Sequence, residues 1–255
     1  MQAIFEATDL SVQFGGIRAV DAVSFAVAPG EVFSIIGPNG AGKTTIFNLI
    51  SRIYQPTSGR LILQGRDITT VPPHRVASLG IARTFQNIEL FSNASVLQNL
   101  LIGCHAHVQA NILSQLLFLP AARRDELVHR ERAEDVIAFL GLQRYRHTLI
   151  GSLPYGVRKV VELGRALCTE PKLLLLDEPS SGLNVEETEG MGYWIEDIKR
   201  DLGITVIMVE HDMSLVSAVS DRVMALNYGK VMAIGTPGEV QTHPEVVRAY
   251  IGGEV

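Results

Sequence analysis

A glycine-rich run near the start of the chain carries the clearest chemical signal. It matches the pattern G-x-x-x-x-G-K-[ST] with the residues Gly37-Pro38-Asn39-Gly40-Ala41-Gly42-Lys43-Thr44-Thr45. Glycine lets a backbone turn tightly and approach an anion with no Cβ in the way. Successive amides then point into an anion nest, which the positive end of a following helix strengthens. The pattern places the Lys43 charge on outer phosphates, and the Thr44 hydroxyl suits Mg²⁺.

The elements around this run must position its amides and Lys43. Residues 31–36 form a short apolar segment ended by glycine, which is typical of a buried strand, and residues 46–50 continue as a helix. A strand, a glycine-rich loop and a helix in this order are the context that a phosphate-binding loop requires. The spacing differs from G-x-G-x-x-G, which disfavours a dinucleotide-binding fold.

Two carboxylates follow a later apolar segment. Residues 173–176 are four leucines, and Asp177 and Glu178 come directly after them. We expect Asp177 to hold a metal ion, directly or through water. We expect Glu178 to orient and deprotonate an attacking water, a role worth ~10²–10⁴ in rate. Alone, this pair would fit a surface loop better; together with the phosphate-binding loop, it favours a nucleotide site.

Two more polar residues follow strand-like segments. Gln86 comes after residues 81–85, and we expect its neutral amide to ligate Mg²⁺ or a water. His211 follows the apolar segment 204–209 and Glu210, which places it at the end of a parallel strand where such sheets bind ligands. Each also fits an ordinary polar position when taken alone. The other histidines and the cysteines lack metal-ligand spacing, so we predict no zinc site.

The pattern of strands and helices indicates an α/β protein. Strand patterns open the chain at residues 4–14 and 19–27. Strand and helix patterns then alternate over three later segments, 173–176, 185–202 and 204–209. This alternation is typical of βαβ units and a parallel sheet. A hairpin is predicted around Asn227-Tyr228-Gly229, and a helix capped by Thr236 after it.

The middle of the chain has a different character, because residues 92–167 show almost only helical pattern. Ser95 and Gln98 have the spacing of a capping box. Residues 123–140 mix both charge signs with apolar positions at helical spacing, which predicts an amphipathic helix rather than a nucleic-acid patch. The body is therefore predicted to be interrupted by a helical insertion.

Composition excludes several classes of protein. The 255 residues are 47% hydrophobic and 19% charged with a net charge of −5, which argues against disorder and against a generic polyanion binder. Two cysteines make no disulfide framework, and Cys168 lies in an apolar run that predicts a buried free thiol. The apolar segment 111–119 is too short for a membrane span, and no secretory signal is present, so a cytoplasmic location is the default.

In their order along the chain, these motifs resemble the ATP-binding subunits of ABC transporters, and the resemblance covers nearly the whole sequence. The run from Gly37 to Thr45 resembles the Walker A loop. Further motifs resemble the Q-loop at Gln86, the Walker B strand and catalytic glutamate at residues 173–178, the D-loop at residues 180–184, and the switch histidine at His211. Phe14 stands where the family often has an aromatic that stacks on adenine, although it also fits a core position.

The stretch that corresponds to the family signature LSGGQ departs from it. It reads Leu153-Pro154-Tyr155-Gly156-Val157, so proline replaces the signature serine and valine replaces the glutamine. The amides of Tyr155 and Gly156 start a predicted helix and are expected to receive phosphate. The two replacements leave side-chain recognition of phosphate at this stretch an open question.

The resemblance implies the P-loop NTPase fold of ABC ATPases. This is an α/β fold with a mixed sheet core, an N-terminal antiparallel β subdomain and an inserted α-helical subdomain. It implies one nucleotide-binding domain over residues 1–255, with the ATP-binding core at 1–91 and 168–255 and the helical, signature-bearing subdomain at 92–167. The implied activity is ATP hydrolysis, with ATP and Mg²⁺ bound.

The signature variant, the helical insertion and the C-terminal ending resemble the longer ATPase subunit of branched-chain amino-acid importers. This resemblance implies a dimer with itself or a paralogous ATPase, two transmembrane permease subunits and, indirectly, a solute-binding protein. It places the chain on the cytoplasmic face of the plasma (inner) membrane, without nucleic acid. Two alternatives stay open: an ATPase subunit for another solute or for lipid export, and a soluble ABC-type switch ATPase. The single cassette and the net charge of −5 count against the switch.

Overall fold

The computed structural model describes residues 2–107 and 120–251, and the apolar segment 111–119 lies outside them. The chain divides into two compact units, Met1–Val76 with Lys172–Val255 and Ala77–Pro171. The predicted helical insertion, 92–167, falls inside the second unit. None of the helices in the described part of the chain is long and apolar enough to cross a membrane.

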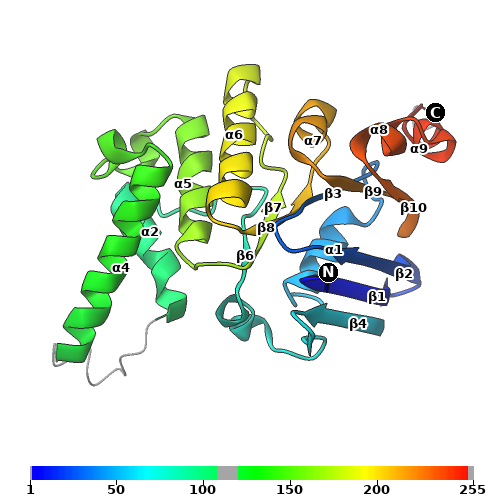
Figure 1. The fold of residues 1–255 in the computed structure, drawn as a ribbon, viewed down its shortest axis with the longest axis horizontal. Coiled ribbons are helices and arrows are strands. Elements are labelled where there is room, and N and C mark those ends of the chain that lie inside the picture. Colours follow the sequence, from blue (N-terminus) through cyan, green and yellow to red (C-terminus); the bar gives the residue numbers. More distant parts are fainter. Residues whose placement is uncertain (1, 108–119, 252–255) are drawn as a thin grey trace. The chain divides into compact units, whose positions relative to one another are not determined.

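The first unit contains an antiparallel sheet with the strand order β2-β1-β4-β5 (Figure 1). Its strands are β1 Phe5–Phe14, β2 Ile17–Val27, β4 Ser58–Leu63 and β5 Arg66–Asp67. The turn between β1 and β2 uses Gly15 at φ 56°, a conformation that glycine adopts without a steric cost. This sheet is the predicted antiparallel N-terminal part of the fold.

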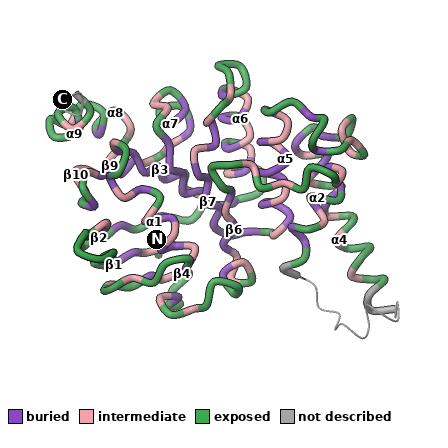
Figure 2. Tube along the Cα trace, turned by 180° about the vertical axis from the view of Figure 1, so that it is seen from behind, coloured by how far each residue is buried: buried purple, intermediate pink, exposed green. Residues whose placement is uncertain are grey.

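The second sheet of this unit is mixed, as predicted. In the first unit its order is β10-β9-β3-β8-β7, in which all neighbours are parallel except β9 and β10. The strands are β3 Val32–Ile36, β7 Leu173–Asp177, β8 Thr205–Val209, β9 Arg222–Asn227 and β10 Lys230–Gly235. Every residue of β3, β7 and β8 is buried (Figure 2), which is the pattern of parallel strands covered on both faces.

Helices follow the strands of this sheet. They are α1 Lys43–Ile50, α6 Val185–Asp201, α7 Met213–Val219, α8 Pro237–Gln241 and α9 Pro244–Ile251. The predicted capping box at Thr236 and Glu239 is present at the start of α8. In the strand register, Val209 of β8 lies opposite both Asp177 of β7 and Ile35 of β3. The chain segments that leave these three strands therefore start at one edge of the sheet.

The second unit is mainly helical. Its longer elements are β6 Ile81–Arg83, α2 Val96–Gly103, α4 Pro120–Phe139 and α5 Tyr155–Leu167. The predicted capping box at Ser95 and Gln98 closes the first turn of α2 in both directions. Cys104 and Cys168 are both free and buried, so the prediction for Cys168 is confirmed.

The contact between α2 and α5 depends on a glycine. A Cβ on Gly103 would lie 2.2 Å from the backbone oxygen of Arg165 and 2.9 Å from the Cβ of Cys168. We therefore expect Gly103→Ala to lower the free energy of unfolding by about 2 kcal/mol, because the helices must separate to admit the methyl group. Urea denaturation followed by circular dichroism measures this change.

The matched control for this prediction is Gly190→Ala in α6. A Cβ there would meet nothing within 4 Å, and alanine favours a helix over glycine, so stability should rise by about 0.5–1 kcal/mol. Equal denaturation midpoints for Gly103→Ala and Gly190→Ala would show that α2 and α5 do not pack as described.

Candidate functional site

The glycine-rich run forms a loop between β3 and α1, and the surroundings of its glycines differ in how much space they leave for a side chain. Gly37, Gly40 and Gly42 all have positive φ angles, of 150°, 80° and 103°. A Cβ at Gly37 would lie 2.3 Å from the oxygen of Leu226, and one at Gly42 would lie 2.6 Å from the oxygen of Ala19. A Cβ at Gly40 would meet nothing within 4 Å. The loop is thus packed at both ends and open at its middle, where an anion can approach the backbone.

The N-terminus of α1 is available to such an anion. Gly42 is its N-cap residue, no side chain caps the helix, and the first turn holds no acidic residue. The first amides of a helix have no partner within the helix, and the helix dipole places partial positive charge there. An anion in the loop would receive hydrogen bonds from these amides.

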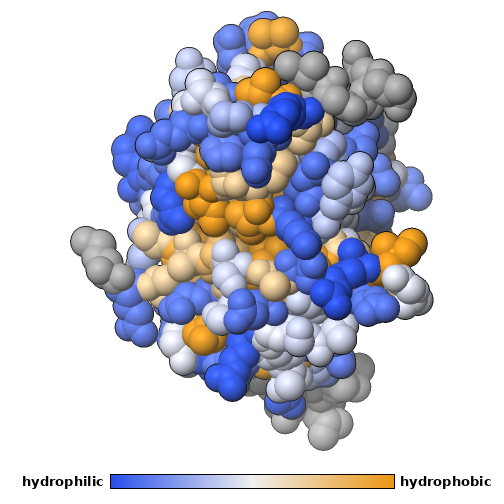
Figure 3. Space-filling model, turned by 90° about the vertical axis from the view of Figure 1, so that its right-hand side faces the viewer, coloured by the Kyte–Doolittle hydropathy of each residue, from blue (hydrophilic) through white to orange (hydrophobic). Residues whose placement is uncertain are grey.

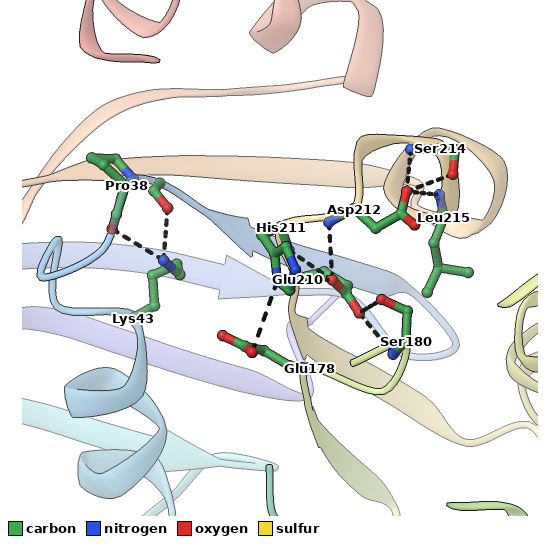
Figure 4. A network of polar contacts seen from close by, with 10 residues as sticks. Pro38, Lys43, Glu178, Ser180, Glu210, His211, Asp212, Ser214 and Leu215 are labelled. Carbon is green, nitrogen blue, oxygen red and sulfur yellow. Dashed lines mark hydrogen bonds and ion pairs between the residues drawn. The ribbon is translucent and has the colours of Figure 1, made fainter. Parts of the chain in front are cut away.

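Lys43 begins α1 and turns back over the loop (Figure 4). Its ammonium donates hydrogen bonds to the carbonyl oxygens of Gly37, at 2.6 Å, and Pro38, at 3.1 Å. Burial lowers the pKa of Lys43, and the nearby carboxylates of Glu178 and Asp177 act in the opposite direction. The structure thus brings the predicted lysine and both predicted acids into one electrostatic cluster.

The two acids lie at the end of β7. Asp177 is its last residue and is buried. Glu178 follows with φ 48°, an uncommon conformation for a residue that is not glycine, and its amide donates to the oxygen of Val209 at 2.9 Å. The oxygen atoms of Asp177, together with the Thr44 hydroxyl, are the hard ligands that Mg²⁺ prefers.

His211 lies at the end of β8, close to two carboxylates. Its Nδ1 atom is 3.8 Å from Oε2 of Glu178 and 3.6 Å from Oε2 of Glu210, so the imidazole stands between them (Figure 4). Its side chain is 60% exposed and therefore open to a ligand. The next residue, Asp212, caps α7 by accepting from the amides of Ser214 and Leu215. A hydrogen bond from the Ser214 side chain is the main cause of the lowered pKa of Asp212.

Glu210 is a residue of this site that the sequence reasoning did not select. It is fully buried and accepts four hydrogen bonds (Figure 4). Oε1 accepts from the amide and the hydroxyl of Ser180, at 2.9 and 2.6 Å. Oε2 accepts from the amides of His211 and Asp212, at 2.7 and 3.0 Å. The available signal was an acidic residue at the end of an apolar strand, directly before the selected histidine.

Phe14 ends β1 and is 45% exposed, which leaves its ring available for stacking. It packs edge-on against Tyr54, with ring centroids 5.0 Å apart and planes at 67°. The strand that follows, β2, brings the oxygen of Ala19 against Gly42 of the glycine-rich loop. Phe14 therefore belongs to a hairpin that contacts the loop, and Tyr54 is a second aromatic that the sequence did not single out.

A cavity of about 1030 Å³ opens beside the loop. It is lined by residues of the loop, of the β9–β10 hairpin and of α9. Apolar side chains gather near the middle of the face that carries these C-terminal elements (Figure 3). On α9, Tyr250 accepts a hydrogen bond from the backbone of Gly37, while burial raises its pKa. The C-terminal helix thus contacts the first residue of the loop, a contact that the sequence did not predict.

The second unit carries the other predicted site residues. Gln86 is exposed in the segment after β6, and its backbone oxygen accepts a hydrogen bond from Lys159 of α5 at 3.1 Å. Glu162 and Arg165, one and two turns further along α5, bond to the amide and the oxygen of Glu89. Burial raises the pKa of Glu162. Three charged side chains of α5 therefore hold the segment that contains Gln86.

The signature-like stretch lies at the N-terminus of α5. Pro154 is the N-cap residue and makes no side-chain cap, as its replacement of serine predicts. Gly156 is buried, whereas Tyr155 is partly exposed with the guanidinium of Arg158 over its ring at 5.6 Å. The amides of Tyr155 and Gly156 therefore lie in the first turn of a helix without a side-chain cap.

Family models and known proteins match the sequence of this chain. A family model described as "ABC transporter" matches residues 20–181, and one described as "Branched-chain amino acid ATP-binding cassette transporter" matches residues 230–255. The chain is 40% identical to the high-affinity branched-chain amino acid transport ATP-binding protein BraF of Pseudomonas aeruginosa, over 98% of both proteins. It is 37% identical to the corresponding protein LivG of Escherichia coli K12, also over 98% of both.

A solved structure has the same fold. It is the ADP conformation of an ATP-binding cassette of an ABC transporter, with a TM-score of 0.87 and 32% sequence identity. The match covers 99% of this chain and 100% of that one. A nucleotide-free cassette from an ABC transporter matches with a TM-score of 0.86 and 32% identity, over 98% of this chain and 100% of that one.

Proposed function

The chain belongs to the ABC transporter family, and from that premise we propose that it binds and hydrolyses ATP to energise an importer of branched-chain or related hydrophobic amino acids. The observation that carries this proposal is the meeting of three segments at one edge of the sheet. They bring the glycine-rich loop with Lys43, the acids Asp177 and Glu178, and His211 together.

In this proposal the triphosphate lies in the loop and along the first turn of α1. Lys43 releases the oxygens of Gly37 and Pro38 and places its ammonium on the outer phosphates. The loop amides of residues 39–45 donate to the phosphate oxygens, and Phe14 stacks on the adenine. These groups fix the nucleotide at the end of the sheet where the carboxylates lie.

The residues present fit a magnesium ion, because the candidate ligands all offer oxygen atoms. We assign Thr44 and Asp177, both of the first unit, to hold it. When bound, the ion supplies positive charge that neutralises the phosphate oxygens.

Glu178 is the proposed general base. It accepts the proton of the attacking water, and a carboxylate near the phosphate contributes ~10²–10⁴ in rate. His211 lies 3.8 Å from the Glu178 carboxylate and is placed to hold both the water and the phosphate oxygens in position. In this proposal His211 is the second catalytic residue. It orients the water and the phosphate oxygens and does not itself need to accept the proton.

The site is proposed to be completed by a second ATPase subunit, either another copy or a paralogue. The first turn of its α5, with the amides of Tyr155 and Gly156, would donate hydrogen bonds to the γ-phosphate. ATP then stabilises the closed dimer because it binds that state more tightly than the open one. Hydrolysis removes this preference, and the dimer reopens.

The remaining proposed partners are two transmembrane permease subunits and, indirectly, a solute-binding protein. The chain itself is proposed to lie on the cytoplasmic face of the plasma (inner) membrane. Support comes from the names of BraF and LivG and from the C-terminal match to the branched-chain amino acid family. These relatives do not favour the lipid-export or switch alternatives.

Purification with partners tests this proposal. The tagged chain is isolated in mild detergent from its own cells, and co-purifying proteins are identified by mass spectrometry. We expect a pair of membrane permeases and a second ATPase, and we expect cells that lack the chain to lose uptake of radiolabelled leucine. Recovery of ribosomal or DNA-associated proteins, with leucine uptake intact, would contradict it.

A further inference from the structure

We propose that Glu210 is a positioning residue for ATP hydrolysis, which fixes the segment after Glu178 to the segment that carries His211. The inference rests on the proposed ATPase function and deepens it by one residue. It is carried by the four hydrogen bonds that the Glu210 carboxylate accepts.

The position of this carboxylate is set by the sheet. Glu210 directly follows β8, the strand that lies between β3 and β7, and its own amide donates to the oxygen of Ile35 on β3 at 3.4 Å. The side chain is completely buried. Each of its two oxygens faces two donors, so both oxygens act as acceptors and together they satisfy all four donors.

One oxygen holds the segment that follows Glu178. Oε1 accepts from the amide and hydroxyl of Ser180, two residues after the proposed base. The same segment is held at Glu178 itself, whose amide donates to Val209. The turn is closed by the amide of Ser181, which donates to the oxygen of Glu178 at 3.1 Å. Glu178 is thus held in its left-handed conformation from both sides, by β8 and by Glu210.

The other oxygen holds the segment that carries His211. Oε2 accepts from the amides of His211 and Asp212, the residues that join β8 to α7. One buried carboxylate therefore anchors two segments whose side chains, Glu178 and His211, stand 3.8 Å apart. Loss of either pair of bonds frees one segment relative to the other, and a misplaced catalytic group lowers the rate steeply.

Glu210→Gln is the sharpest test, because it keeps the size of the side chain. The amide nitrogen would face two donors, so either Ser180 or the His211–Asp212 pair loses its acceptor. We expect kcat to fall at least tenfold with the KM for ATP changed by less than threefold. Glu31→Gln is the control: Glu31 is also buried, and it accepts from the amide of Ala28 and from Arg222 rather than from the site. The Glu31→Gln protein should hydrolyse ATP at the wild-type rate.

A double-mutant cycle with His211→Ala separates positioning from general damage. If Glu210 acts by placing His211 and Glu178, the double variant should be little slower than the slower single variant. Multiplied losses, or an equal fall in kcat for Glu31→Gln and Glu210→Gln, would overturn the inference. A folded Glu210→Gln protein with kcat within twofold of wild type would also overturn it.

Two further outcomes keep the inference distinct from the proposed function. If Glu210→Gln does not fold, Ser180→Ala is the substitute test, because it removes the hydroxyl donor to Glu210 and keeps the backbone amide donor. We expect this variant to have a two- to fivefold lower kcat. An unchanged kcat would count against the role of Glu210. If the wild-type protein, assembled with its partners, hydrolyses no ATP, the proposed function itself is wrong. Hydrolysis by the wild type with no response to Glu210→Gln rejects only the positioning role.

Discussion

Glu178→Gln should keep ATP binding and lower the rate of ATP hydrolysis by about 10²–10⁴, because it removes the proposed base while conserving the size of the side chain. Glutamine cannot accept the proton of the attacking water. Bound ATP should then persist, and the protein should elute as an ATP-held dimer. Steady-state phosphate release and size-exclusion chromatography with and without ATP measure the two effects.

A control with the same chemical change is Glu186→Gln on α6. Glu186 is an exposed residue in the first turn of that helix. The Glu186→Gln protein should therefore hydrolyse ATP at the wild-type rate. Equal turnover of wild type, Glu178→Gln and Glu186→Gln would remove Glu178 from the role of base.

Lys43→Ala should weaken ATP binding at least tenfold, or about 1.4 kcal/mol. The ammonium of Lys43 is held at the mouth of the loop by the oxygens of Gly37 and Pro38, and alanine offers no replacement charge for the phosphates. Hydrogen bonds to charged groups contribute about 1.5–3 kcal/mol, so the loss should be readily measured. Isothermal titration calorimetry of the purified chain with ATP gives the dissociation constant directly.

Lys172→Ala is the matched control, since Lys172 precedes β7 at the end opposite to Asp177. Its ammonium bonds to Gln64 rather than to the loop. Its removal should leave the dissociation constant for ATP unchanged. Normal ATP affinity of Lys43→Ala would mean that the lysine does not contact phosphate.

The elements that position the site were predictable where their apolar residues follow one pattern. β3, β7 and β8 are continuous apolar runs because both faces of the sheet are covered, and all three were predicted close to their observed bounds. β4 was missed: Ser58–Leu63 has few buried positions and pairs with β1, which is about 50 residues earlier in the chain. A short strand whose partner is distant in sequence leaves little local signal.

Within the site, too, local residue patterns were predictive, whereas contacts between residues distant in sequence were not. The glycine-rich loop and the acids after β7 stood out because their residue types are unusual at such positions. Glu210 did not, since its four hydrogen bonds come from backbone amides and a serine that the fold brings together. Tyr250 was missed for a similar reason, because its partner is the backbone of Gly37, more than 200 residues away in the chain. The resemblance to ABC transporter ATPases, in contrast, depends on local motifs and is confirmed by the family match.

A crystal structure of this chain with Mg²⁺ and a non-hydrolysable ATP analogue tests the central claim most directly. We predict a triphosphate cradled by the amides of residues 39–45, with Lys43 turned from the oxygens of Gly37 and Pro38 onto the phosphates and Glu178 beside the outermost one. Density for the analogue elsewhere, or an empty loop at saturating analogue, would contradict the account.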